Sequence, residues 1–193
     1  PPRWRLVRAG KMAGWRGDRR VGIQGSEGRD LGIDSNGAAM VDVATETTQP
    51  FLKSRGYGFD PKSIAEIGRA VADGLTDGGV LPVLKHIPGH GRAQVDSHLD
   101  LPRVSASRDE LEADFAPFKA LNDLPLGMTA HLVYEAIDAR PATTSKKMIG
   151  LIRDHNGFDG LILTDDVSME ALSGSVTGRS AGSKKAGGAG GAG

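Results

Sequence analysis

The sequence of 193 residues contains no cysteine, few aromatic side chains and no excess of either charge. Without cysteine the chain forms no disulfide, offers no thiolate nucleophile and cannot build a zinc site of cysteine ligands. No apolar run reaches the ~20 residues that a membrane-spanning helix needs, and no apolar signal-peptide core stands near the beginning. The 24 basic and 24 acidic residues balance. We therefore expect no nucleic acid as partner, because its phosphate backbone attracts a basic surplus, and no membrane, because the chain has no apolar span.

Both ends of the chain differ from its middle in composition. Residues 1–30 carry scattered arginines, lysines and glycines without an apolar period. This is typical of a disordered or non-native segment, with a nucleic-acid-binding arm as the alternative. Residues 180–193 contain only Gly, Ala, Ser and Lys, the composition of a flexible tail without a packing role. We expect an atypical segment over 1–30, a folded domain over 31–174 and a flexible tail over 175–193.

Between these ends, short apolar runs alternate with segments of helical periodicity. The helical segments open with capping residues: Asp60 before Pro61, Ser107 paired with Glu110, and Ser145. The apolar runs predict strands over 37–43, 80–84, 126–132 and 160–164. Alternating strands and amphipathic helices predict an α/β fold with a parallel sheet. In such folds, open or closed into a barrel, active sites lie at the carboxyl ends of the strands.

Titratable side chains cluster at the ends of three of these apolar runs. They are Lys85, His86 and His90 after the second run, His131 near the end of the third, and Asp165 and Asp166 after the fourth. Charged groups and ring nitrogens are costly at the end of a buried strand unless they catalyse a reaction or bind a ligand. The pattern is therefore typical of an enzyme active site.

A metal site is one hypothesis for this cluster, because histidine and carboxylate ligands suit zinc and other divalent ions. Its candidate ligands are His86, His90, His98, His131, Asp165 and Asp166. Their spacing matches no metal-binding motif, and Pro88 with two flanking glycines makes the segment between His86 and His90 a turn. The sequence also lacks a G-x-G-x-x-G or Walker A motif. The sequence therefore favours neither a metal nor a nucleotide cofactor. A metal-dependent hydrolase stays as the alternative hypothesis for the function.

Two carboxylates offer chemistry that needs no metal. Asp165 suits a nucleophile or a general base, whereas Asp166 points to the opposite side of an extended chain and is expected to cap the next helix. Asp96 and His98 are separated by one residue, so on an extended loop both side chains lie on one side. The carboxylate would then hold the imidazole and raise its pKa. The alternative for this pair is an ordinary surface loop.

Several of these motifs follow one another in a characteristic order. They are Lys85-His86-Ile87-Pro88-Gly89-His90-Gly91, Asp96-Ser97-His98, Met128-Thr129-Ala130-His131 and Thr164-Asp165-Asp166-Val167-Ser168-Met169. With them, residues 31–174 closely resemble the β-N-acetylglucosaminidases of glycoside hydrolase family 3, bacterial enzymes of peptidoglycan recycling. The resemblance implies a (β/α)8 TIM-type barrel, incomplete at both ends in this chain, with 31–174 as its catalytic part.

The resemblance also implies a retaining mechanism with named residues. Asp165 aligns with the nucleophile, and His98 with Asp96 aligns with an acid/base dyad that replaces the second carboxylate usual in glycosidases. The residues that would bind the sugar are Arg55, Lys85, His86 and Met169. The implied substrates are saccharides containing N-acetylglucosamine, derived from peptidoglycan and hydrolysed in the cytoplasm, and no cofactor is implied.

The resemblance fades before residue 31 and after Gly174, where the first and last strands of the barrel are expected. A barrel without these strands leaves strand edges unpaired and core surface exposed. An inactive, sugar-binding fragment of the glycosidase is therefore a third hypothesis. Hydrolysis of an aryl N-acetyl-β-glucosaminide separates the glycosidase from such a fragment, and resistance to a chelator separates it from the metal-dependent hydrolase.

Overall fold

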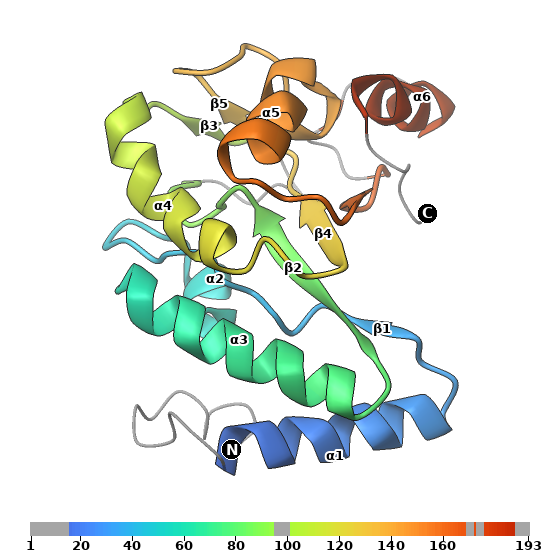
Figure 1. Cartoon of the computed structure of the whole chain (residues 1–193). Coiled ribbons are helices and arrows are strands. Elements are labelled where there is room, and N and C mark those ends of the chain that lie inside the picture. The colour runs from blue at the N-terminus through green and yellow to red at the C-terminus, as the bar shows by residue number, and fades with distance from the viewer. Residues whose placement is uncertain (1–15, 95–100, 169–171, 173–175, 188–193) are drawn as a thin grey trace.

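A four-stranded sheet with the strand order β1-β2-β4-β6 runs through the molecule (Figure 1). The structure is a computed structural model that describes residues 16–94, 101–168, 172 and 176–187. The strands are β1 (Ser35–Asn36), β2 (Leu81–Ile87), β4 (Leu126–Thr129) and β6 (Leu161–Thr164). All three pairings are parallel. The predicted α/β fold with a parallel sheet is therefore confirmed.

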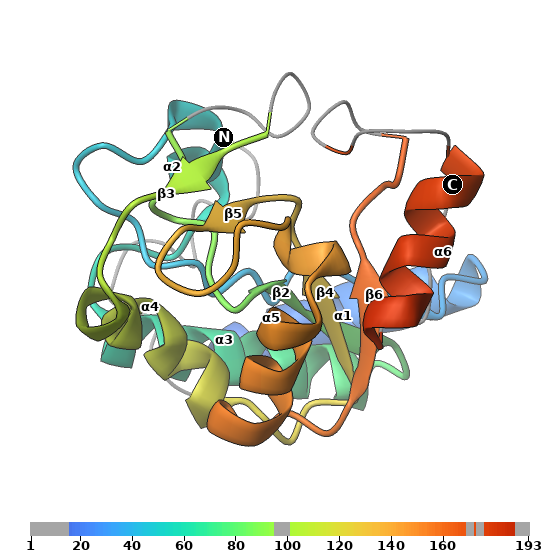
Figure 2. The same cartoon turned by 90° about the horizontal axis from the view of Figure 1, so that it is seen from above.

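Helices connect the strands in the predicted alternation. After β1 come α2 (Pro50–Arg55) and α3 (Pro61–Asp77), after β2 comes α4 (Arg108–Ala120), and after β4 come η2 (Ala142–Thr144), α5 (Lys146–Gly150) and the π-helical turn η3 (Leu151–His155). A small second sheet pairs β3 (Arg103–Val104) with β5 (Val133–Tyr134). Figure 2 shows α3, α4 and α5 arranged side by side along the strands. No helix among the residues that the structure describes is long and apolar enough to cross a membrane.

The predicted capping residues begin the helices. Asp60 accepts a hydrogen bond from the backbone N–H of Ser63 at 2.8 Å, directly before Pro61. Ser107 and Glu110 form the expected reciprocal capping box at the start of α4. The hydroxyl of Ser145 accepts from the backbone N–H of Met148 at 3.1 Å. Each cap satisfies a backbone donor that the first turn of a helix leaves free, which is why these starts were predictable.

The main hydrophobic core lies between the sheet and the helices α3, α4 and α5. Its largest fully buried side chains are Tyr134, Phe115, Phe118, Phe158, Ile64 and Leu84. At the amino ends of β2 and β6, by contrast, Leu81 and Leu161 are 47% and 52% exposed. The polar residues described below all lie toward the opposite, carboxyl ends of the strands.

The strand predicted over 37–43 is shorter than expected. Only Met40 forms a parallel bridge, to Lys85, supported by the bond from the N–H of Val41 to the carbonyl of Lys85 at 2.9 Å. The next donor along β2, the N–H of His86, goes to the carboxylate of Asp42 and not to a backbone carbonyl. At this point the side chain of Asp42 replaces a backbone carbonyl as hydrogen-bond acceptor, and the regular strand pairing ends.

The described part of the segment 1–30 also differs from the expectation, because Arg16–Asp30 forms helix α1, whereas residues 1–15 lie outside the described residues. This helix lies against the outer side of α3 (Figure 1). An added Cβ on Gly78, the residue directly after α3, would lie 2.6 Å from the Cα of Gly25 of α1. The packing uses glycine and a single buried valine, Val21, which joins Val71 and Leu75 in a small separate cluster. Such an interface leaves no apolar period in the sequence, so the helix was missed.

The described part of the tail expected over 175–193 differs in the same way, whereas residues 175 and 188–193 lie outside the described residues. Residues Val176–Ala186 form helix α6, which lies beside α5 and η2 (Figure 1). The small side chains of Ser183 and Ala186 are buried there. Small residues allow a helix to pack closely, but a composition of Gly, Ala, Ser and Lys is also that of a linker. Composition alone therefore could not distinguish the two.

We expect Gly78→Ala to lower the free energy of unfolding by about 1–3 kcal/mol, because the new methyl group would overlap backbone atoms of α1 that cannot rotate away. The φ of Gly78 is −80°, so the backbone itself accepts alanine. The matched control is Gly150→Ala at the end of α5, where the only neighbour of an added Cβ is 3.9 Å away. Denaturant unfolding of the three proteins measures both effects. Equal stabilities for the two variants would contradict the close packing of α1 on α3.

Candidate active site

A cluster of titratable side chains gathers at the carboxyl ends of the parallel strands. Its members are Asp42, Lys85, His86, His90, His131 and Asp165, together with Arg55 at the end of α2. Three of them, Asp42, His90 and His131, are at most 3% exposed. Such burial is costly for polar groups unless each finds a partner.

Asp42 is the carboxylate around which the first part of the cluster is built. It accepts hydrogen bonds from the N–H of His90 at 2.6 Å and from that of His86 at 3.2 Å, and it bonds Nδ1 of His86 at 2.7 Å. Burial on its own raises the pKa of Asp42, but the charge of His86 and the hydrogen bonds outweigh it and leave the pKa below its usual value. Because an ionised carboxylate only accepts, Nδ1 of His86 carries the proton. The other edge of the His86 ring then remains for a ligand.

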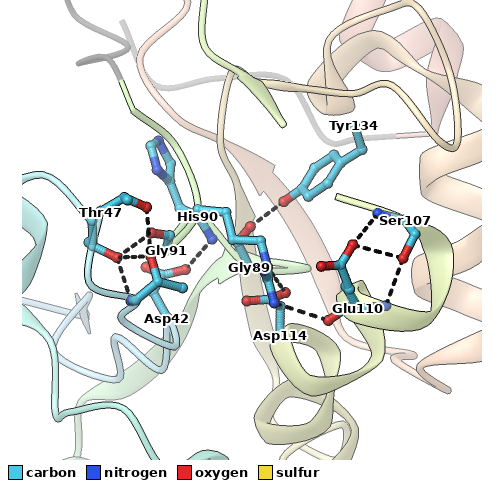
Figure 3. A network of polar contacts seen from close by, with 12 residues as sticks. Asp42, Thr47, Gly89, His90, Gly91, Ser107, Glu110, Asp114 and Tyr134 are labelled. Carbon is cyan, nitrogen blue, oxygen red and sulfur yellow. Dashed lines mark hydrogen bonds and ion pairs between the residues drawn. The ribbon is translucent and has the colours of Figure 1, made fainter. Parts of the chain in front are cut away.

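The loop after β2, residues 88–92, is held from several elements at once (Figure 3). The hydrogen bonds that hold it run from the Tyr134 hydroxyl to the carbonyl of Gly89, from the Thr48 hydroxyl to the carbonyl of Gly91, from Nε of Arg92 to Asp114 at 2.6 Å, and from His90 to Asp42. Because β5, α4 and the segment after Asp42 all contribute, the loop has a defined place relative to the sheet. The glycines let its backbone come this close.

His90 projects from this loop as a neutral side chain. Its ring lies edge-on to that of His86, with the centroids 5.3 Å apart, and it is 2% exposed. Burial, reinforced by the charge of His86, lowers the pKa of His90 to about 4, although the negative charges of Asp42 and Asp165 oppose this. The imidazole is therefore uncharged near neutral pH.

Lys85 brings a positive charge toward Asp165. Its ammonium group lies over Gly37, where an added Cβ would come within 2.8 Å of Nζ, so a larger residue at position 37 would displace it. Burial lowers the pKa of Lys85, and the charge of Arg55 lowers it further, while Asp165 and Asp42 raise it. Arg55 itself is directed by Phe51, whose ring lies 5.5 Å from the guanidinium carbon. The structure thus places both Arg55 and Asp165 within electrostatic reach of Lys85.

Asp165 follows the last residue of β6. Its N–H donates to the carbonyl of Thr129 at 3.0 Å, which continues the parallel pairing of β4 and β6, and its Oδ1 accepts from the N–H of Asp166 at 2.9 Å. Oδ1 of Asp166 accepts from the N–H of Ser168 at 2.8 Å. Asp166 therefore supports the backbone locally, as expected, although it does so in a turn at 167–168 where a helix cap was predicted.

His131 is tied into the protein by both ring nitrogens. Nδ1 bonds the hydroxyl of Thr143 at 2.8 Å, and Nε2 bonds the carbonyl of Asp166 at 2.8 Å. With neither nitrogen left for a ligand, His131 does not fit the metal site that the sequence left open. Among the described residues, no three histidine, aspartate or glutamate side chains gather in a metal-binding arrangement.

Three of the residues predicted for the site, Asp96, His98 and Met169, lie outside the described residues. The structure brings together the other four: Asp165, Lys85, His86 and Arg55. Sequence reasoning missed the central role of Asp42 in the site, although its position after an apolar run could have indicated it. Asp42 follows the apolar run Ala39-Met40-Val41, as Asp165 follows its own strand.

Comparison with known proteins gives consistent matches. Residues 20–190 match the family model described as "Glycosyl hydrolase family 3 N terminal domain". A beta-hexosaminidase of Alkalilimnicola ehrlichii is 37% identical over 153 residues, which are 77% of this chain and 44% of that protein. The family match extends beyond both limits of the domain expected over 31–174. The chain spans less than half the length of this curated relative.

Solved structures agree with this match. A glycoside hydrolase family 3 beta-N-acetylglucosaminidase from Paenibacillus superimposes with a TM-score of 0.85 and 33% identity over 91% of this chain and 35% of that one. NagZ from Neisseria gonorrhoeae, in complex with N-trifluoroacetyl-D-glucosamine, gives a TM-score of 0.82 and 32% identity, covering 91% of this chain and 52% of that one. The predicted (β/α)8 barrel class is confirmed, with this chain forming part of the barrel.

We expect the stability of the protein to fall as the pH drops from 6.5 to about 4, because an unfolded chain binds a proton on His90 near pH 6.5 and the folded chain only near 4. The contribution of neutral His90 to the free energy of unfolding is present in full above pH 6.5. At pH 4 the loss of this contribution is on the order of 3 kcal/mol. Denaturant unfolding across this range should show a flatter pH dependence for His90→Phe, which keeps the backbone N–H that bonds Asp42. An unchanged slope would contradict a buried, neutral His90.

Proposed function

The chain belongs to glycoside hydrolase family 3, and from this membership we propose that its domain hydrolyses terminal β-linked N-acetylglucosamine residues. The observation that carries the proposal is the position of Asp165. It stands at the carboxyl end of β6, within electrostatic reach of Lys85, whose pKa it raises. The family 3 enzyme from Paenibacillus is named a beta-N-acetylglucosaminidase, and NagZ from Neisseria gonorrhoeae was solved with an N-acylated glucosamine. Both support this choice of sugar.

The proposed reaction proceeds through a covalent glycosyl-enzyme. An oxygen of Asp165 forms a bond to the anomeric carbon while the bond to the leaving oxygen breaks, and His98 donates a proton to that oxygen. Water then attacks the anomeric carbon, His98 takes up its proton, and the carboxylate of Asp165 is released. Asp96 would orient the imidazole. These roles for Asp96 and His98 rest on the sequence motif.

The sugar hydroxyls would be held by Lys85, His86 and Arg55. Asp42 fixes the ring of His86 by its Nδ1, so the opposite nitrogen is presented in one direction. Lys85 and Arg55 are donors without acceptor capacity, which suits the lone pairs of hydroxyl oxygens. The contribution of Met169, the origin of the substrate in peptidoglycan and a cytoplasmic location stay predictions from the sequence resemblance.

We expect Asp165→Asn to lower the hydrolysis of 4-nitrophenyl N-acetyl-β-glucosaminide by about 10³-fold or more, because an amide is a poor nucleophile. Asparagine keeps the oxygen that accepts from the N–H of Asp166, so the loop stays supported. The matched control is Asp166→Asn, which likewise keeps its acceptor for Ser168. Rates and melting temperatures are measured for all three proteins. Loss of activity in the control but not in Asp165→Asn would move the nucleophile by one residue. A wild-type chain that melts cooperatively without hydrolysis would overturn the proposal for this chain.

We expect His98→Ala to slow the hydrolysis of a disaccharide far more than that of an aryl glycoside. A sugar hydroxyl leaves only when it is protonated, whereas nitrophenolate departs with little help. The second step loses its base with either substrate, so the aryl glycoside should give a burst followed by slow turnover. Single-turnover rates for both substrates isolate the first step. Equal losses would show that His98 is not the proton donor.

A further inference from the structure

Most backbone N–H and carbonyl groups of residues 165–168, the four residues after β6, make hydrogen bonds. The N–H of Asp165 bonds Thr129, the N–H of Asp166 bonds Oδ1 of Asp165, and the N–H of Ser168 bonds Oδ1 of Asp166. Two carbonyls in the same stretch, those of Asp166 and Val167, are bound by side chains from elsewhere in the chain. The segment 165–168 is therefore fixed from outside as well as from within.

The first of these side chains is that of His131, from the segment that follows β4. A carbonyl oxygen only accepts, so Nε2 carries the hydrogen that is donated to Asp166. Burial lowers the pKa of His131, and Nδ1 bonds the hydroxyl of Thr143 at 2.8 Å. The Thr143 hydroxyl lies 3.2 Å from that of Thr129, the residue whose carbonyl binds the N–H of Asp165. One network therefore contacts Asp165 on one side and Asp166 on the other.

The second side chain is that of Arg179, in helix α6. Its guanidinium donates from one terminal nitrogen to the carbonyl of Val167 at 3.0 Å. His131 and Arg179 thus bind successive carbonyls, one from the segment after β4 and the other from α6. Helix α6 packs against the short helix η2, and Thr143 of η2 is hydrogen-bonded to His131.

We propose that His131 and Arg179 are positioning residues that hold the carboxylate of Asp165 in line for attack. The proposal rests on the proposed function of Asp165 as nucleophile. The peptide plane before Asp165 is fixed by Thr129 and the plane after Asp166 by His131, so the plane between them, whose N–H directs Oδ1, has little freedom. A displacement of about 1 Å at a reacting group slows a reaction by about 10²-fold.

Amide hydrogen exchange of the full chain, without substrate, tests the positioning apart from catalysis. We expect His131→Leu and Arg179→Met to speed exchange at Asp165 and Ser168 by about tenfold or more, with β4 still protected. His131→Gln keeps a donor toward the carbonyl of Asp166 and should restore protection. The matched control is Lys184→Met, which removes a positive charge from an exposed position of α6. Unchanged exchange at 165–168 in both variants would overturn the proposal, whether or not the chain hydrolyses a glycoside.

Kinetics of the same variants then test the role in the reaction. We expect kcat on the aryl glycoside to fall by about 10²-fold in His131→Leu and Arg179→Met, with KM little changed, and to recover in His131→Gln. Faster exchange with an unchanged kcat would overturn the proposal. If the wild-type chain exchanges as expected but does not hydrolyse the substrate, the proposed function fails, and the exchange result still decides whether the two residues fix the segment. Because the variants lie on different elements, failure of one to fold leaves the other to decide.

Discussion

A carboxylate that water cannot reach has to find its hydrogen-bond donors within the protein, and Asp42 finds them in the segment that ends β2. Its two oxygens take the N–H groups of His86 and His90 and the ring of His86. An unpaired buried charge costs several kcal/mol, so this segment can adopt no fold that leaves Asp42 without these donors. The direction of the His86 ring, the place of loop 88–92 and the end of the first strand all follow from this requirement.

Hydrogen bonds from distant elements also fix the part of the site that contains Asp165. Asp165 is half-buried and lies near the charge of Lys85, and the backbone on which it stands is bound by groups from β4 and α6. The histidines around Asp165, His90 and His131, are kept neutral by burial. A site with few mobile charges and many fixed hydrogen bonds suits chemistry in which a charge develops at one carbon atom.

Sequence reasoning succeeded where structure is determined locally. The caps at Asp60, Ser107 and Ser145 each depend on residues three positions apart, and strand ends carry polar residues that stand out in a linear reading. It failed where an element is held by distant backbone. The two-residue strands β3 and β5 have no period to detect, and α1 and α6 pack through glycine and other small residues.

The candidate site follows the same division. Asp165, Lys85 and His86 stand in motifs and were predicted, and Arg55 was recognised through the family resemblance. Asp42 was missed, because its role comes from partners more than forty positions away. Arg179 lies in a stretch whose composition resembles a linker, so only the contact with Val167 gives it a role. A single sequence contains no record of which distant groups meet.

The packing of α1 has a consequence for how the molecule opens. Its apolar contacts belong to the small cluster of Val21, Val71, Leu75 and Val80, which is separate from the main core between the sheet and the other helices. Release of α1 therefore exposes little apolar surface and leaves the main core closed, so it requires less free energy than global unfolding. A protease that attacks only opened chain would therefore cut within α1 before the main core opens, and the strand ends with their charges and hydrogen bonds would stay folded.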